Sequence, residues 1–170
     1  FCDTIEISVE VKPEQVAPSA AVLAALKDPS KRVASSSADP TECKLEELPS
    51  QPTLTIRVTV PASDVSRTLA TVFPEVLGVM GEVGAAMAGP PFTRYHTDDG
   101  KTVDIEAGIP LRQKAEGKGR VKASELPAGK TAVTWHVGPY DDLPKSHARL
   151  SAWLASNSLR SRGGMWEVYF

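Results

Sequence analysis

The order of the predicted elements constrains this fold more than any single motif does. From Cys43 onward, apolar periodicity predicts strand, strand, helix, strand, strand, and then strand, strand, helix, strand. The predicted strands span residues 44–48, 53–60, 92–97, 102–109, 119–126, 131–137 and 165–170. This order is a duplication that lacks its last strand. It predicts an α+β domain built from two copies of one small unit.

The first predicted helix follows Ser63, which is placed to cap it. Apolar residues then recur at helical spacing as far as Val83. Pro74 falls inside this pattern and should kink the helix or split it in two. The segment 84–91, rich in glycine and proline, ends it.

The second predicted helix follows Asp141 and Asp142, either of which can cap it. Pro144 fits its first turn, where the missing N–H costs nothing. Trp153 belongs to the apolar stripe of this helix, so we expect it in the core. Asp-Gly within residues 98–100 predicts a tight hairpin between two strands of the first unit.

An isolated strand is predicted near the start of the chain, at Thr4 to Val11. Apolar and polar residues alternate there without a break, which is typical of a half-buried strand. We expect this strand to pair beside residues 165–170 and to supply the missing edge. The predicted organisation is an N-terminal strand at 1–12, a linker with a short helix at 13–42, and a ligand-binding domain at 43–170.

Composition excludes several classes of protein. Apolar residues make up 41% of the chain, which is enough for an ordinary core, and the net charge of −2 offers no basic field for nucleic acid. No apolar stretch is long enough to cross a bilayer and no secretion signal is recognisable, so we expect a cytoplasmic protein without a membrane partner. The two cysteines and three histidines match no metal-binding spacing, and no metal or cofactor is expected.

Glu167 stands out as an acid within a run of large apolar residues, GMWEVYF at 164–170. If its side chain faces inward, the carboxylate loses hydration and needs a cation, a hydrogen-bond donor or a bound proton. Two plainer alternatives are a solvated strand face and an ion pair with an arginine such as Arg94. Glu167 is the leading candidate for a functional residue.

Several segments in a fixed order resemble the GyrI-like small-molecule-binding domains, which also occur as effector-binding domains of AraC-type and BmrR-type regulators. The matching segments are FPEVL at 73–77, GPPFTRYH at 89–96, DIEAGIP at 104–110, LPAG at 126–129, HVGPYDDL at 136–143, WL at 153–154 and GMWEVY at 164–169. The resemblance covers residues 43–170. It implies two βαββ modules that form one curved antiparallel sheet, with two helices on one face and a ligand cleft on the other.

The resemblance also implies roles for individual residues. Glu167 matches the acid that lies at the centre of the family's cleft, and Tyr95 matches a position that often offers a cleft hydroxyl, although Tyr95 could equally be a ring at the sheet margin. Strand alternation then turns Tyr169 the same way as Glu167. The same alternation places Trp166, Val168 and Phe170 on the helix-packed side. The closing strand that usually follows this segment in the family is absent here, as is a DNA-reading helix-turn-helix.

Three further residues are candidates for the ligand-binding cleft. Glu106 shares a strand face with Asp104 and is either solvated or a second acid of the cleft. Trp135 and His136 point to opposite faces of one strand, so only one of them can line the cleft. The pattern does not decide which.

The predicted function is binding of a hydrophobic, often cationic small molecule, with Glu167 as countercharge. Some members of the family are associated with hydrolytic opening of cyclopropane-bearing genotoxins, which gives an alternative in which Glu167 and Tyr95 are catalytic. A third alternative, after GyrI itself, is a protein partner in place of a ligand.

Overall fold

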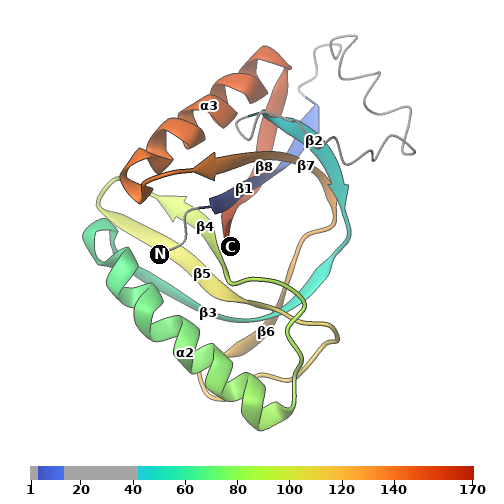
Figure 1. Ribbon diagram of the computed structural model, residues 1–170, viewed down its shortest axis with the longest axis vertical. Coiled ribbons are helices and arrows are strands. Elements are labelled where there is room, and N and C mark those ends of the chain that lie inside the picture. The colour runs from blue at the N-terminus through green and yellow to red at the C-terminus, as the bar shows by residue number, and fades with distance from the viewer. Residues whose placement is uncertain (1–3, 14–41) are drawn as a thin grey trace.

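The computed structural model describes residues 4–13 and 42–170 (Figure 1). Its strands are β1 (Thr4–Pro13), β2 (Lys44–Leu48), β3 (Gln51–Pro61), β4 (Phe92–Asp98), β5 (Thr102–Pro110), β6 (Lys122–Leu126), β7 (Gly129–Val137) and β8 (Leu159–Tyr169). Its helices are α2 (Val65–Val83) and α3 (Leu143–Ser156), preceded by the 3-10 turns η1 (Ala62–Asp64) and η2 (Tyr140–Asp142). The predicted helix at 20–26 and nearly all of the predicted linker lie outside the described residues. The sixth strand begins at Lys122, three residues later than predicted.

The strands form one antiparallel sheet in the order β2-β7-β1-β8-β4-β5-β3-β6. In the first unit, β5 lies between β3 and β4. In the second unit, β1 lies between β7 and β8 in the same way. The N-terminal strand therefore occupies the place of the second unit's missing last strand. Its expected pairing beside residues 165–170 is confirmed. It also pairs with β7, so the expectation that it forms an edge is wrong. The reason is that β1 inserts between β7 and β8 as β5 inserts between β3 and β4.

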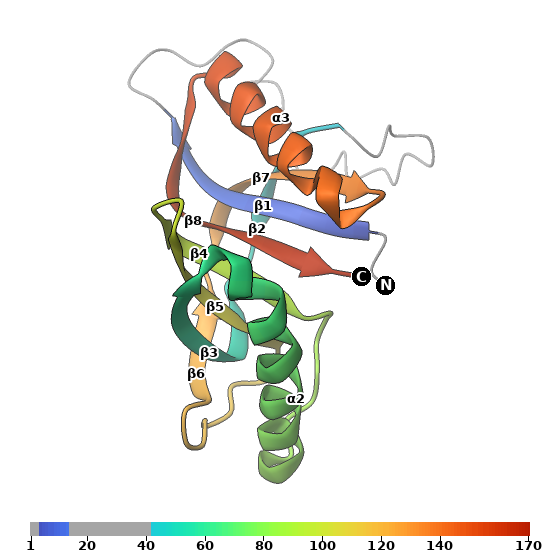
Figure 2. The same cartoon turned by 90° about the vertical axis from the view of Figure 1, so that its left-hand side faces the viewer.

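Two short links force the sheet to curl. Only Pro49 and Ser50 separate β2 from β3, and only Pro127 and Ala128 separate β6 from β7. Yet β2 pairs with β7, and β6 pairs with β3, so each link joins strands from opposite ends of the sheet. Such a link spans about 11 Å at most, at about 3.8 Å per residue step. The two edges must therefore approach each other, and the predicted curved antiparallel sheet with two helices is confirmed (Figure 2).

Both helices cover the same face of the sheet. Directly paired residues of neighbouring strands share a face, and one such row runs through Ile7, Glu167, Thr93, Ala107 and Ile56. At one end of the row, Ile7 belongs to the core cluster that α3 covers. At the other end, Ala107 and Ile56 belong to the cluster that α2 covers. We call this side of the sheet the helix face and the opposite side the helix-free face.

The start of α2 and its proline differ from expectation. Asp64 rather than Ser63 is the N-cap residue, and no side-chain hydrogen bond caps the helix, because η1 leads directly into it. Pro74 lies inside one unbroken helix. Pro74 and Ala70, whose carbonyl loses its helical partner, are both exposed, so water can satisfy that carbonyl. Gly84 ends the helix with a left-handed φ of 67°, as its position predicted.

The position of β1 predicts how much the domain depends on it. Ile7 is fully buried, so Ile7→Ala should lower the free energy of unfolding by about 2 to 5 kcal/mol. Leu77→Ala, on the exposed side of α2, should change it by less than about 1 kcal/mol. Urea denaturation of the two variants measures both effects. Equal stability of the two would show that β1 is dispensable.

Candidate functional site

The Glu167 carboxylate lies on the helix face and is only 1% exposed. The hydroxyl of Tyr169 donates to Oε2 at 2.9 Å, and the hydroxyl of Tyr95 donates to the same oxygen at 3.1 Å. On the other side, His147 Nε2 lies 2.9 Å from Oε1. We call Glu167, Tyr95, Tyr169, His147 and their neighbour Tyr140 the Glu167 cluster.

Strand pairing and one helix bring this cluster together. Thr93 of β4 lies directly opposite Glu167 of β8, which places Tyr95 at the diagonal position on the same face. Tyr169 follows Glu167 by two residues on β8 and therefore shares its face. His147 comes from α3, which packs across this half of the sheet and starts after η2. Phe73 of α2 meets the Tyr169 ring edge-on, with the ring centroids 6.1 Å apart.

The tyrosines of the cluster are held in their protonated form. Burial, and then the charge of Glu167, raise the pKa of Tyr95 well above its ordinary value. The same two causes raise the pKa of Tyr169 and of Tyr140. A protonated phenol is a hydrogen-bond donor, so the two hydroxyls stabilise an ionised carboxylate without bringing a charge of their own.

The outer members of the cluster are His147 and Tyr140. The His147 side chain is 30% exposed and Tyr140 is 48% exposed, whereas Glu167 is almost completely covered. His147 Nε2 is itself buried and is not aligned for a hydrogen bond, so its contact with Oε1 is an ion pair when the ring is protonated. His147 and Tyr140 are therefore the solvent-facing members of the cluster.

The structure brings only some of the predicted site residues together. Tyr95 and Tyr169 contact Glu167 as described. His136 lies on the helix face, but its ring nitrogens contact Ser146 Oγ and the Pro139 carbonyl, both at 3.0 Å. Trp135 lies on the helix-free face, where its ring is 5.1 Å from that of Phe170. The predicted roles of these residues in ligand binding stay predictions.

The face assigned to Trp166 is wrong. Trp166 pairs with Arg94 of β4, which in turn pairs with Glu106 of β5, and this row lies on the helix-free face. Val168 and Phe170 alternate with Tyr169 and share that face. The expectation placed Glu167 opposite the helices because the resemblance put the ligand cleft on the face away from them. Tyrosine hydroxyls and a histidine satisfy the carboxylate here, so it lies beneath the helices, and Arg94 faces away from it.

Glu106 belongs to a separate network on the helix-free face. Thr55 Oγ1 donates to Oε1 at 3.0 Å, Ser124 Oγ donates to the same oxygen, and His96 Nε2 lies 2.8 Å from Oε2. Burial of the carboxylate opposes ionisation, but these hydrogen bonds outweigh it and hold the pKa of Glu106 below its ordinary value of 4.5. Glu106 is buried, so the solvated alternative is wrong, and it is not a second acid of the Glu167 cluster.

Sequence reasoning missed His147, although its position carried a signal. It is spaced with Leu143, Leu150 and Leu154 along the buried stripe of α3. A histidine in such a stripe needs a polar partner below it. Glu167 is that partner.

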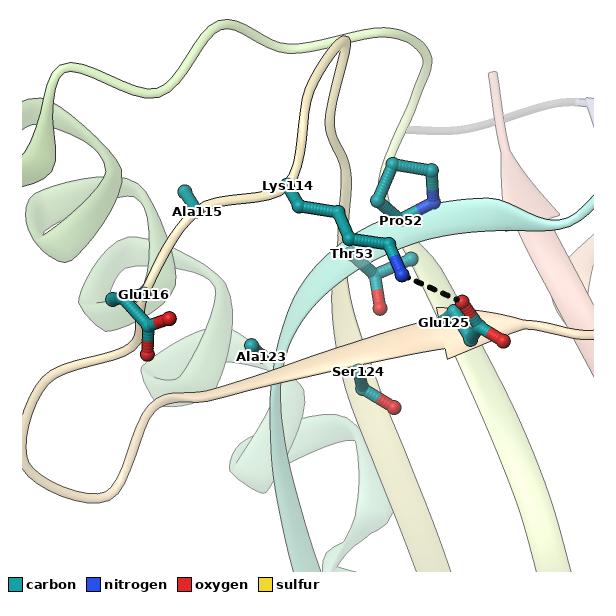
Figure 3. A pocket seen from close by; sticks show the side chains of 8 residues that line it. All are labelled: Pro52, Thr53, Lys114, Ala115, Glu116, Ala123, Ser124 and Glu125. Carbon is teal, nitrogen blue, oxygen red and sulfur yellow. Dashed lines mark ion pairs between the residues drawn. The ribbon is translucent and has the colours of Figure 1, made fainter.

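A surface pocket of about 520 Å³ lies away from the Glu167 cluster, at the β6 edge of the sheet (Figure 3). Pro52, Thr53, Lys114, Ala115, Glu116, Ala123, Ser124 and Glu125 line it. Lys114 Nζ lies 3.6 Å from Glu125 Oε2 across it, and both side chains are more than half exposed. This pocket contains no member of the cluster, and we do not regard it as the site.

Within residues 4–13 and 42–170, no three potential metal ligands gather in one place. No helix in these ranges has the length and apolar character to span a bilayer. Cys43 is a free thiol.

Comparisons with known proteins agree on one kind of domain. A family model described as "GyrI-like small molecule binding domain" matches residues 41–170. The crystal structure of the EcmrR C-terminal domain is similar, with 25% identity, a TM-score of 0.60, and coverage of 76% of this chain and 95% of that one. An EcmrR chain in a cryo-EM complex with DNA is similar to the same extent, with 25% identity and a TM-score of 0.60. The match again covers 76% of this chain, but only 56% of that EcmrR chain. No curated protein sequence matches.

The Glu106 network predicts a pH-dependent contribution to stability. Because the pKa of Glu106 is lower in the folded protein, its ionisation stabilises the fold above pH 4.5, and this contribution disappears as the pH falls further. Glu106→Gln should therefore cost about 1.5 to 3 kcal/mol at pH 6, and less as acid protonates the wild-type carboxylate. Chemical denaturation across pH 3 to 7 measures the difference, with exposed Glu125→Gln as control. A pH-independent difference would contradict the prediction.

Proposed function

This chain belongs to the family of GyrI-like small molecule binding domains, and from that premise we propose that it binds a hydrophobic organic cation at the Glu167 cluster. The domain is related to effector-binding domains of regulators. The chain spans little more than half of the EcmrR chain that is seen with DNA, so the proposal concerns ligand binding alone.

The observation that carries the proposal is a fully covered carboxylate that faces a partly exposed histidine. Glu167 is 1% exposed, and a buried charge needs compensation. Neutral tyrosine hydroxyls satisfy Oε2, but neither contacts Oε1. Oε1 faces His147, a partly exposed side chain that can move. A cationic ligand that replaces His147 beside Oε1 supplies the positive charge that the buried carboxylate needs.

Aromatic rings around the carboxylate support a ligand with an apolar body. Tyr95, Tyr169 and Tyr140 surround Glu167, and Phe73 extends the ring surface toward α2. Cation–π contact with such rings contributes about 0.5 to 2 kcal/mol, and more where water is excluded. The combination favours flat or ring-bearing monocations over small hydrated ones.

Binding requires a local opening. The carboxylate has almost no exposed surface, so the ligand must displace the partly exposed His147 and Tyr140. These two residues come from α3 and the adjoining turn η2. We place the access route there, on the helix face, and the bound ligand between the sheet and the start of α3.

Glu167→Gln tests the countercharge. The amide keeps the shape but loses the charge, so affinity for an aromatic dye with a permanent positive charge should fall about 10- to 100-fold. Affinity for a neutral dye of the same shape should change little. Fluorescence titration across pH measures these affinities.

Glu106→Gln is the matched control, because it removes a buried carboxylate from the opposite face. It should leave dye binding unchanged. Equal affinity of wild type and Glu167→Gln for the cation at every pH would exclude the countercharge role.

A further inference from the structure

We infer that His147 is an internal competitor for the cation site, so that the unliganded protein is closed by its own histidine and ligand affinity depends on the charge of that side chain. The inference rests on the proposed function and adds a regulatory residue to it. It concerns the unliganded state as much as the liganded one.

Geometry gives His147 the position that a ligand's charge must take. Its Nε2 lies 2.9 Å from Oε1, the carboxylate oxygen that the two tyrosines leave open. This nitrogen is buried and makes no hydrogen bond, so Oε1 is the polar atom that it faces. A second cation cannot occupy the same place. The imidazole must therefore leave before a ligand cation meets Oε1.

His147 is the basic side chain that contacts Glu167. The sheet presents Glu167 and Tyr169 from β8 and Tyr95 from β4, and η2 presents Tyr140. Phe73 from α2 brings no charge. The charged neighbours of His147 on α3 bond elsewhere: Arg149 to Thr134, Ser146 and the Trp135 carbonyl, and Lys145 to Asp142. Of these groups, His147 is the one that brings a positive charge to Glu167.

A histidine makes this competition adjustable. Lysine or arginine would hold the carboxylate permanently, whereas histidine gains and loses its charge between about pH 5 and pH 8. A charged imidazole closes the site, and a neutral one releases it. A permanently charged ligand should therefore bind more tightly as pH rises through this range, and part of that rise should depend on His147.

The expected size of the effect follows from occupancy. A protein whose open state is only a fraction f of the population binds with an apparent Kd of the intrinsic Kd divided by f. If the ion pair holds the site closed for two thirds to nine tenths of the time, its removal should tighten binding about 3- to 10-fold. The effect should be largest near pH 6 and should shrink toward pH 8.

The test is a titration of the full chain with a permanently charged aromatic monocation, such as a tetraarylphosphonium dye, between pH 6 and 8. His147→Gln, which stays polar and neutral, should bind it about 3- to 10-fold more tightly at pH 6 and show a flatter pH profile. His147→Lys should bind it weakly at every pH. His96→Gln is the matched control, because His96 meets the other buried glutamate on the helix-free face.

Combining His147→Gln with Glu167→Gln separates the possible failures. The histidine change should have no effect once Glu167 is neutral. If Glu167→Gln alone leaves cation binding unchanged, the proposed function fails, and this inference fails with it. If Glu167→Gln weakens binding while His147→Gln leaves the affinity and its pH profile unchanged, or weakens binding, the inference alone is overturned.

A second readout does not depend on the variants. Nuclear magnetic resonance of the ring nitrogens of His147 in the wild-type protein should show a change on addition of the cation, as the imidazole leaves the carboxylate. The resonances of His96 should not move. An unchanged His147 signal at saturating cation would overturn the inference.

Discussion

The antiparallel pairing of β4 with β8 is the contact on which the rest of this structure depends. It joins the two halves of the duplicated domain and sets their faces in register, so that Thr93 meets Glu167 and Arg94 meets Trp166. A slip of one residue would move Glu167 to the helix-free face and Trp166 under the helices. The tyrosine pair, the position of α3 over the carboxylate and the separation of the two buried acids all follow from this one register.

Two buried glutamates illustrate two ways to compensate a charge. Glu106 meets Thr55, Ser124 and His96, which are all directed at a carboxylate fixed within the sheet. Glu167 contacts two phenols through one oxygen and a partly exposed imidazole through the other. The first arrangement is complete and suits a structural role. In the second arrangement, the position beside Oε1 is taken by a side chain that a ligand can replace, which suits ligand recognition.

The sequence predicted the local elements well because their causes are local. Alternation identified β1, Asp-Gly identified the hairpin, and the strand order identified the duplication. The apolar neighbours of Glu167 also indicated its burial. The sequence did not reveal which face the helices cover, because that depends on register between strands more than 70 residues apart. His147 was missed for the same reason: its partner lies on another element, and α3 brings them together only in three dimensions.

The insertion of β1 between β7 and β8 has a consequence for how the chain is made. Ile5 pairs with His136 and with Tyr169, so β1, which is synthesised before β7 and β8, waits for both of them before its hydrogen bonds can form. The first half can assemble early from β3, α2, β4 and β5. The second half closes only when β1 meets β7 and β8 from far along the chain, a step of high contact order. β1 is thus synthesised before its two neighbours in the sheet, but it can take its place only after both have been made.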